Sequence, residues 1–142
     1  MNDEEIRLYI ERRELWKRTP DTLRADSLIA AALRNASFGK NIPIKEDTAA
    51  NIFKSFYDAF RQLGDAAWWK KGYEPRSHEV SIRVLEEAEI KVSFELRKID
   101  RFRRIRHDEE YRGGIVRPDQ AQEIAEFWDN VSNELIDWLK KK

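Results

Sequence analysis

The residues best suited to chemistry lie within sixteen positions, Ile99 to Gly114, which read IDRFRRIRHDEEYRGG. This stretch gathers arginines around His107, one of only two histidines in the chain, and ends in a tyrosine, an arginine and a glycine pair. Guanidinium groups bind phosphate through paired hydrogen bonds, and imidazole exchanges protons near neutral pH. The pattern therefore predicts phosphate binding, with His107 as the candidate acid–base group.

The spacing of this stretch is typical of a helix with one apolar side. Apolar residues recur in steps of three: Ile99, Phe102 and Ile105. Arg103 and Arg106 lie at the edges of that stripe, where a guanidinium must find a carboxylate, a phosphate or a backbone acceptor. Two interpretations stay open, a phosphate-bearing ligand or ion pairs between helices or across a dimer. The candidate partners for internal ion pairs are Asp65, Asp100 and Glu110.

The elements that must position these residues are predicted to be helices almost throughout. Five glycines and four prolines leave few breaks, and strand-like alternation is missing. Two weakly alternating runs, Val80–Leu85 and Ile90–Leu96, suit helices equally well. Helices are expected at 3–17, 22–38, 47–71, 78–87, 89–110 or 111, and 118–141. We therefore expect an all-α protein, one domain over residues 1–142, folded as an up-and-down bundle of four to five helices.

The expected helix at 47–71 should be the spine of this bundle. Its apolar stripe follows helical spacing: Ala49, Ile52, Phe53, Phe56, Phe60, Leu63 and Ala67. Asp47 or Thr48 is expected to cap its start, and Gly72 to end it. Along one flank, Tyr57, Arg61 and Asp65 follow at four-residue steps, which would let them meet the arginine-rich helix.

The neighbouring helices are expected to cover the spine. The helix at 22–38 offers the core Leu23, Leu28, Ala31, Ala32 and Leu33. The last helix offers Ile124, Phe127, Trp128, Val131, Leu135, Trp138 and Leu139. Ser77 is expected to cap the short helix at 78–87. His78 then either belongs to the capping turn or has a functional role.

Composition and charge exclude several classes of function. The 27 basic and 27 acidic residues cancel, so attraction to nucleic acid or an anionic membrane must come from a local patch. The chain lacks cysteine, which excludes disulfides and thiolate metal sites. Neither a metal nor a cofactor is predicted, because two histidines alone make a poor metal site and no phosphate-cradling glycine loop is present. No secretory signal or membrane-length apolar run is seen, so we expect a cytoplasmic protein without membrane contact.

Three pieces of the sequence occur in an order that is known from one family. They are AANIFKSFYDAFRQLGDAAWWKKGYEPRSHEVSI, then IDRFRRIRHDEEYRGG, then RPDQAQEIAEFWDNV. Together they resemble the HEPN superfamily of small prokaryotic helical-bundle proteins, and the likeness covers about Asp47 to Leu139. The resemblance implies a homodimer formed through the helix that bears the arginine motif. Many HEPN proteins are metal-independent endoribonucleases, often toxins coupled to a minimal nucleotidyltransferase antitoxin.

The family's nuclease motif is an arginine, usually followed by a polar residue, with four to six residues in all before a histidine. Arg106 matches the arginine and His107 the polar residue, which puts Tyr111 at the position of the catalytic histidine. Tyrosine, with an ordinary pKa of about 10, is a poor base at neutral pH. A second register pairs Arg101 with His107 but has Phe102 in place of the polar residue. On an ideal helix Arg106 and Tyr111 are about 140° apart, so sharing a site requires a bent helix or two subunits.

The sequence thus supports three hypotheses. The favoured one is a HEPN-like homodimer with a degenerate ribonuclease motif, a nucleotidyltransferase as a potential partner, and a dimer-axis cleft that binds RNA or nucleotide phosphate through Arg103, Arg106, His107 and Tyr111. The second is an active metal-independent endoribonuclease of a toxin–antitoxin type system, with Arg101 or Arg106 on the phosphate and His107 as catalytic group. The third is a structural dimerisation module whose arginines are satisfied internally. Residues expected to support a ligand site are Tyr57, Arg61, Asp65 and His78.

Overall fold

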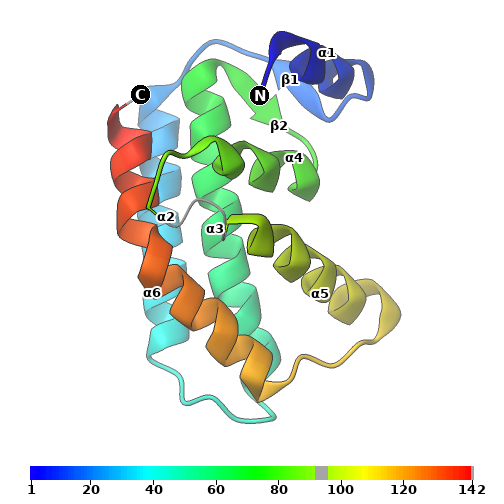
Figure 1. The fold of residues 1–142 in the computed structure, drawn as a ribbon, viewed down its shortest axis with the longest axis vertical. Coiled ribbons are helices and arrows are strands. Elements are labelled where there is room, and N and C mark those ends of the chain that lie inside the picture. The colour runs from blue at the N-terminus through cyan, green and yellow to red at the C-terminus, as the bar shows by residue number, and fades with distance from the viewer. Residues whose placement is uncertain (92–95, 142) are drawn as a thin grey trace.

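Three long helices form the body of the protein. The computed structural model describes residues 1–91 and 96–141. In Figure 1, α2 (Thr22–Lys40), α3 (Ala49–Lys71) and α6 (Pro118–Lys141) run side by side. Helix α3 lies at the centre and contacts α2 most extensively, followed by α6. The described residues therefore confirm an all-α helical bundle, to which only a two-stranded ribbon is added.

The core is built on α3, as its apolar stripe predicts. Every residue of that stripe is buried: Ala49, Ile52, Phe53, Phe56, Phe60, Leu63 and Ala67. The ring of Phe60 contacts Phe127 and Trp128 of α6, with centroid distances of 5.4 and 5.0 Å. The predicted stripe of α6 is also buried, except that Trp138 is only half-buried. Removing this apolar surface from water is the main source of stability.

Helix α2 buries Ile29 and small residues rather than the leucines that its sequence suggests. Leu23 and Leu33 are 81% and 48% exposed, and of the five expected core residues only Ala32 is fully buried. The two helices approach so closely that a Cβ at Gly39 would lie 2.8 Å from the ring of Phe56. Larger side chains are excluded from this contact. The expectation for Leu23 and Leu33 is therefore wrong, and α2 runs two residues further than predicted, to Lys40.

The first expected helix is wrong beyond Glu11. Helix α1 spans Asp3–Glu11, and Arg13 then adopts a positive φ of 60°, which is incompatible with a continuing helix. Strand β1 (Leu15–Lys17) follows and pairs antiparallel with β2 (Tyr73–Pro75). Three-residue strands are too short to show an alternating pattern, which is why the sequence indicates none.

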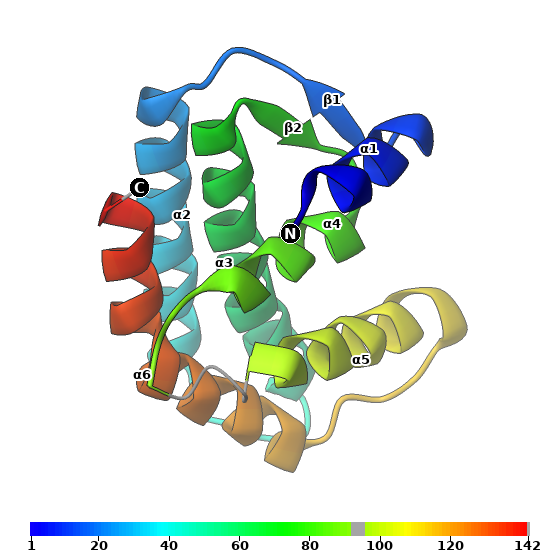
Figure 2. The ribbon, with the colours of Figure 1, turned by 45° about the horizontal axis from the view of Figure 1, so that its top comes forward.

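The helix expected from Glu89 begins later, so part of that expectation is wrong. Helix α4 (His78–Arg83) passes into the 3-10 helix η1 (Val84–Glu87), and Glu89–Lys91 are not helical. Positions 92–95, within the weakly alternating run, lie outside the described residues. Helix α5 spans Lys98–Arg112 and ends at Gly113, which has a φ of 70°. Figure 2 shows α5 projecting from one side of α3, next to α4.

Candidate functional site

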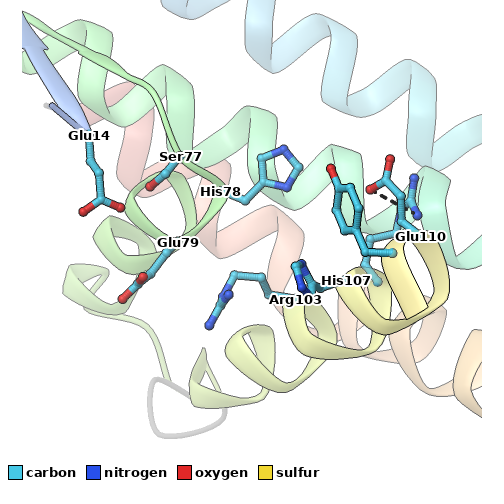
Figure 3. A pocket seen from close by; sticks show the side chains of 9 residues that line it. Glu14, Ser77, His78, Glu79, Arg103, His107 and Glu110 are labelled. Atoms are coloured by element: carbon cyan, nitrogen blue, oxygen red, sulfur yellow. Dashed lines mark ion pairs between the residues drawn. The ribbon is translucent and has the colours of Figure 1, made fainter. Parts of the chain in front are cut away.

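A pocket of about 380 Å³ lies between α4 and α5. From α5 it is lined by Arg103, Arg106, His107, Glu110 and Tyr111. From the start of α4, and from the residue before β1, come Ser77, His78, Glu79 and Glu14. Figure 3 shows His78 and His107 extending from the two helices into the space between them. One chain thus brings together the four residues expected to bind ligand at a dimer-axis cleft, with His78 added.

Helix α4 is fixed to α3 by close backbone contact. A Cβ at Gly64 of α3 would overlap the carbonyl oxygen of Ser81, so only glycine permits this approach. The buried indole of Trp68 donates a hydrogen bond to the carbonyl of Val80 at 2.8 Å, and the Ser81 hydroxyl donates to Asp65. Ser77 caps the helix as predicted, accepting a hydrogen bond from the amide of Val80. His78, the next residue, is thereby held at the pocket.

Helix α5 is anchored by its first half. Phe102 is fully buried and meets Phe53 of α3 edge to face, with ring centroids 5.8 Å apart. Only Ile99 and Phe102 of this helix are fully buried. Since the apolar stripe ends at the half-buried Ile105, the following turns are free of the core and line the pocket.

The pocket arginines form ion pairs with carboxylates of their own helix. Arg106, whose side chain is 12% exposed, lies 2.7 Å from Glu109 and 3.6 Å from Glu110, and Arg103 lies 3.0 Å from Asp100. Asp100 and Glu110 are therefore confirmed as partners, but both pairs lie within α5, so the expectation of pairs between helices is wrong for them. Asp65 instead pairs with Arg61 at 3.5 Å. Residues three or four positions apart on a helix are nearest neighbours, which favours these local pairs. A guanidinium has five N–H donors, so each pair leaves donors for a ligand.

Tyr111 shares the pocket with Arg106 although α5 is one continuous helix. Its ring lies against that of His107, one turn earlier, with a centroid distance of 4.9 Å. Arg106 and Tyr111 both line this pocket of a single chain. The geometric expectation that sharing needs a bent helix or two subunits is therefore wrong. The angle of about 140° describes where the two Cβ atoms point and does not limit where long side chains end.

Arg101 is not brought to the pocket. Its guanidinium pairs with Glu123 of α6 and lies 5.3 Å from the ring of Phe102. The alternative register of Arg101 with His107 therefore has only its histidine among the pocket residues.

Of the four residues expected to support the site, three line a second pocket of about 260 Å³, namely Arg61, Asp65 and His78, and Tyr57 lies buried beside His78. Arg61, Asp65, Arg76 and Ser81 line this second pocket, which shares Ser77 and His78 with the first. The ring of Tyr57 lies next to that of His78, with a centroid distance of 5.9 Å. Tyr57 is buried, and in the described part of the chain neither its hydroxyl oxygen nor Nε of Arg61 has a hydrogen-bond partner.

Burial and nearby charged groups set the protonation states of Tyr57, His78 and Asp65. Burial raises the pKa of Tyr57 well above its usual range, and Arg61, Arg103 and Arg106 only partly oppose this. The hydroxyl therefore stays a neutral donor. Burial, together with Arg61 and Arg106, lowers the pKa of His78, which favours a neutral imidazole. Burial also raises the pKa of Asp65, although Ser81 and Arg61 stabilise its charged form.

Sequence reasoning missed Glu14 and Glu79, two carboxylates of the pocket. In Figure 3 they lie toward the end of the pocket away from Glu110. Within the described residues neither carboxylate forms an ion pair. Adjacency to His78 is a weak signal for Glu79. Glu14 has no signal at all, because only the turn before β1 carries it to the pocket. The lining therefore carries three carboxylates and two guanidinium groups.

Other routes to a function find no support. The described residues hold no group of three or more histidine, aspartate or glutamate side chains arranged to bind a metal ion. None of the described helices is long and apolar enough to span a membrane. Comparison of the chain with protein-family models, curated proteins and solved structures found no match.

Proposed function

We propose that this protein binds RNA or a nucleotide in the pocket between α4 and α5, as a HEPN-like protein with a degenerate ribonuclease motif. The observation that carries the proposal is that Arg103, Arg106, His78, His107 and Tyr111 line one pocket. Guanidinium groups suit phosphate oxygens, and imidazole and phenol rings offer both hydrogen bonds and a face for base stacking.

The mixed charge of the pocket narrows the class of ligand. Glu14, Glu79 and Glu110 oppose a bare polyanion, since they bring negative charge to the same lining as the two arginines. A nucleotide carries hydrogen-bond donors on its base and ribose in addition to its phosphate, and carboxylates accept from such donors. The lining therefore suits a nucleotide unit better than inorganic phosphate alone.

The proposal includes pairing of two chains near the free end of α5. Tyr111, which lines the pocket, and Ile115, just after α5, are 69% and 85% exposed, and exposed large apolar side chains favour a protein contact. Such a contact would bring two pockets together. The nucleotidyltransferase partner rests on the family resemblance alone.

Binding tests the proposal directly. We expect the double variant Arg103→Ala, Arg106→Ala to bind labelled single-stranded RNA and AMP at least ~10-fold more weakly than the wild type, because hydrogen bonds to charged groups are lost. Fluorescence anisotropy and calorimetry measure the two affinities. The control is Arg7→Ala with Arg34→Ala, which removes the same charge from exposed positions of α1 and α2. Equal affinity of wild type and the pocket variant would contradict the proposal.

RNA cleavage is a second candidate, favoured by the two histidines in one pocket. Two imidazoles suffice for general acid and base catalysis, and the lowered pKa of His78 makes it the candidate base. We expect the wild type to bind RNA without cutting it. Cleavage that persists in EDTA and disappears in both His78→Ala and His107→Ala would establish the nuclease instead.

A further inference from the structure

Behind His78, helix α3 carries two buried hydrogen-bond donors that no described residue satisfies. Tyr57 is 1% exposed, and its hydroxyl has no partner. Nε of Arg61, one turn later on α3, also has none, and its distance of 3.9 Å to Asp58 is too long for a hydrogen bond. A buried donor without an acceptor is destabilising. Two such donors one turn apart on the same helix indicate a place for an acceptor.

The surroundings of these donors favour an acceptor that is negatively charged. Arg61, Arg103 and Arg106 all act electrostatically on the hydroxyl of Tyr57, against the single carboxylate of Asp58. Because burial keeps the phenol protonated, its O–H is available to donate a hydrogen bond to such an acceptor. These arginines belong to two helices, α3 and α5.

His78 is the pocket residue that lies beside Tyr57. Its ring is next to that of Tyr57, it lines both pockets, and it is exposed. A ligand in either pocket can reach the buried hydroxyl only if the side chain of His78 rotates away. A phosphate that binds at this buried position must be the terminal group of its ligand. An internal phosphodiester continues in two directions, whereas a terminal phosphate has three free oxygens.

We infer that Tyr57, Arg61 and His78 form a subsite for the terminal phosphate of a nucleotide or of an RNA end. The inference rests on the proposed function, since the nucleoside part would occupy the pocket between α4 and α5. The hydroxyl of Tyr57 and Nε of Arg61 donate to two phosphate oxygens. Asp65, the carboxylate of the second pocket, is already engaged by Ser81 and Arg61.

The test compares ligands that differ only in where their phosphate lies. The wild type and Tyr57→Phe are titrated by calorimetry with adenosine, with 5′-AMP, with 3′-AMP and with the dinucleoside monophosphate ApA. We expect the wild type to bind one of the monophosphates more tightly than adenosine and ApA. Tyr57→Phe should weaken the binding of that monophosphate by ~10-fold, the effect of losing one hydrogen bond to a charged group. Its affinity for ApA should stay within about twofold of the wild type.

Two further variants sharpen the measurement. Arg61→Lys keeps the positive charge but removes the Nε donor, so it should also weaken the monophosphate selectively. Tyr73→Phe is the matched control, because its ring packs against Trp68 and does not line either pocket. It should bind every ligand as the wild type does.

Thermal melting separates a ligand role of Tyr57 from a structural one. Without ligand, Tyr57→Phe should melt no lower than the wild type, because it removes an unsatisfied donor. With the monophosphate, its melting temperature should rise less than that of the wild type. A lower melting temperature without ligand, or unchanged monophosphate affinity, would overturn the subsite. If Arg103→Ala, Arg106→Ala still loses RNA and AMP binding, the proposed function survives that outcome. If the wild type binds none of the phosphate ligands or RNA, both proposals fail.

Discussion

Helices α5 and α6 are both amphipathic, yet the bundle uses them in opposite ways. The 24 residues of α6 bury nine side chains along its whole length. The 15 residues of α5 bury only Ile99 and Phe102, both near its start. The second half of α5 instead carries ion pairs between its own residues, such as Arg106 with Glu109. The difference shows that α6 is a structural element throughout, whereas α5 is half anchor and half site.

The same contrast holds for the two sides of α3. Toward α6, Phe60 contacts aromatic rings and presents no polar atom. Toward α4 and α5, Tyr57 and Arg61 keep buried donors without partners. Consistent packing on one side and unsatisfied groups on the other are expected when a protein gives up local stability at a functional site.

The largest expected effect comes from the anchor of α5. Phe102→Ala should lower the free energy of unfolding by about 3–5 kcal/mol, because a buried aromatic ring is lost against Phe53 and Phe127. Urea denaturation measures this. Tyr111→Ala, on the exposed half of the same helix, should change it by less than about 0.5 kcal/mol. Similar losses for both variants would contradict the division of α5 into two halves.

The next effect concerns the contact that positions α4. Gly64→Ala places a methyl group against the backbone of Ser81, so α4 must move away from α3. We expect a loss of about 1–3 kcal/mol in the free energy of unfolding and weaker AMP binding, since His78 moves with α4. Urea denaturation and calorimetry measure the two effects. Wild-type stability and affinity in this variant would show that α4 is not fixed by this contact.

These regions also differ in how far the sequence predicts them. The stripes of α3 and α6 extend over many turns, so their periodicity is unambiguous and their burial follows. The prediction that Leu23 is buried is wrong because the close approach of α2 to α3 at Gly39 decides which face of α2 is exposed. That approach is a tertiary property. Strand β1 was not predicted because it forms only by pairing with residues almost sixty positions away.

The residues of the candidate site also differ in how far the sequence predicts them. Arg103, Arg106, His107 and Tyr111 are local in sequence, so their cluster is visible before any fold is known. Glu14 is carried to the same pocket by the β ribbon, and no local pattern announces it. The unsatisfied hydroxyl of Tyr57 is a matter of three-dimensional packing, so the sequence suggests the residue but not its state.

A smaller effect should appear in the pH dependence of stability. Burial, Arg61 and Arg106 lower the pKa of His78 in the folded protein below its unfolded value of about 6.5. Below that pH the unfolded chain takes up a proton that the folded one still excludes. The free energy of unfolding therefore falls as the pH falls from about 6.5 toward the folded pKa. Urea denaturation from about pH 5 to about pH 7.5, where histidine titrates, measures this fall. The free energy of unfolding should fall less steeply in His78→Gln than in the wild type. An identical slope would show that His78 is equally solvated in both states.

The smallest effect is expected at Arg101, which connects α5 to α6. Its pair with Glu123 is largely exposed, so Arg101→Ala should lower the free energy of unfolding by at most about 1 kcal/mol. AMP and RNA affinity should stay within about twofold of the wild type, because Arg101 lies outside the pocket. Arg106→Ala is the matched comparison, since it removes the same charge from the same helix. A loss of affinity in Arg101→Ala as large as in Arg106→Ala would place the ligand on the α6 side of α5, contrary to the division drawn between these two helices.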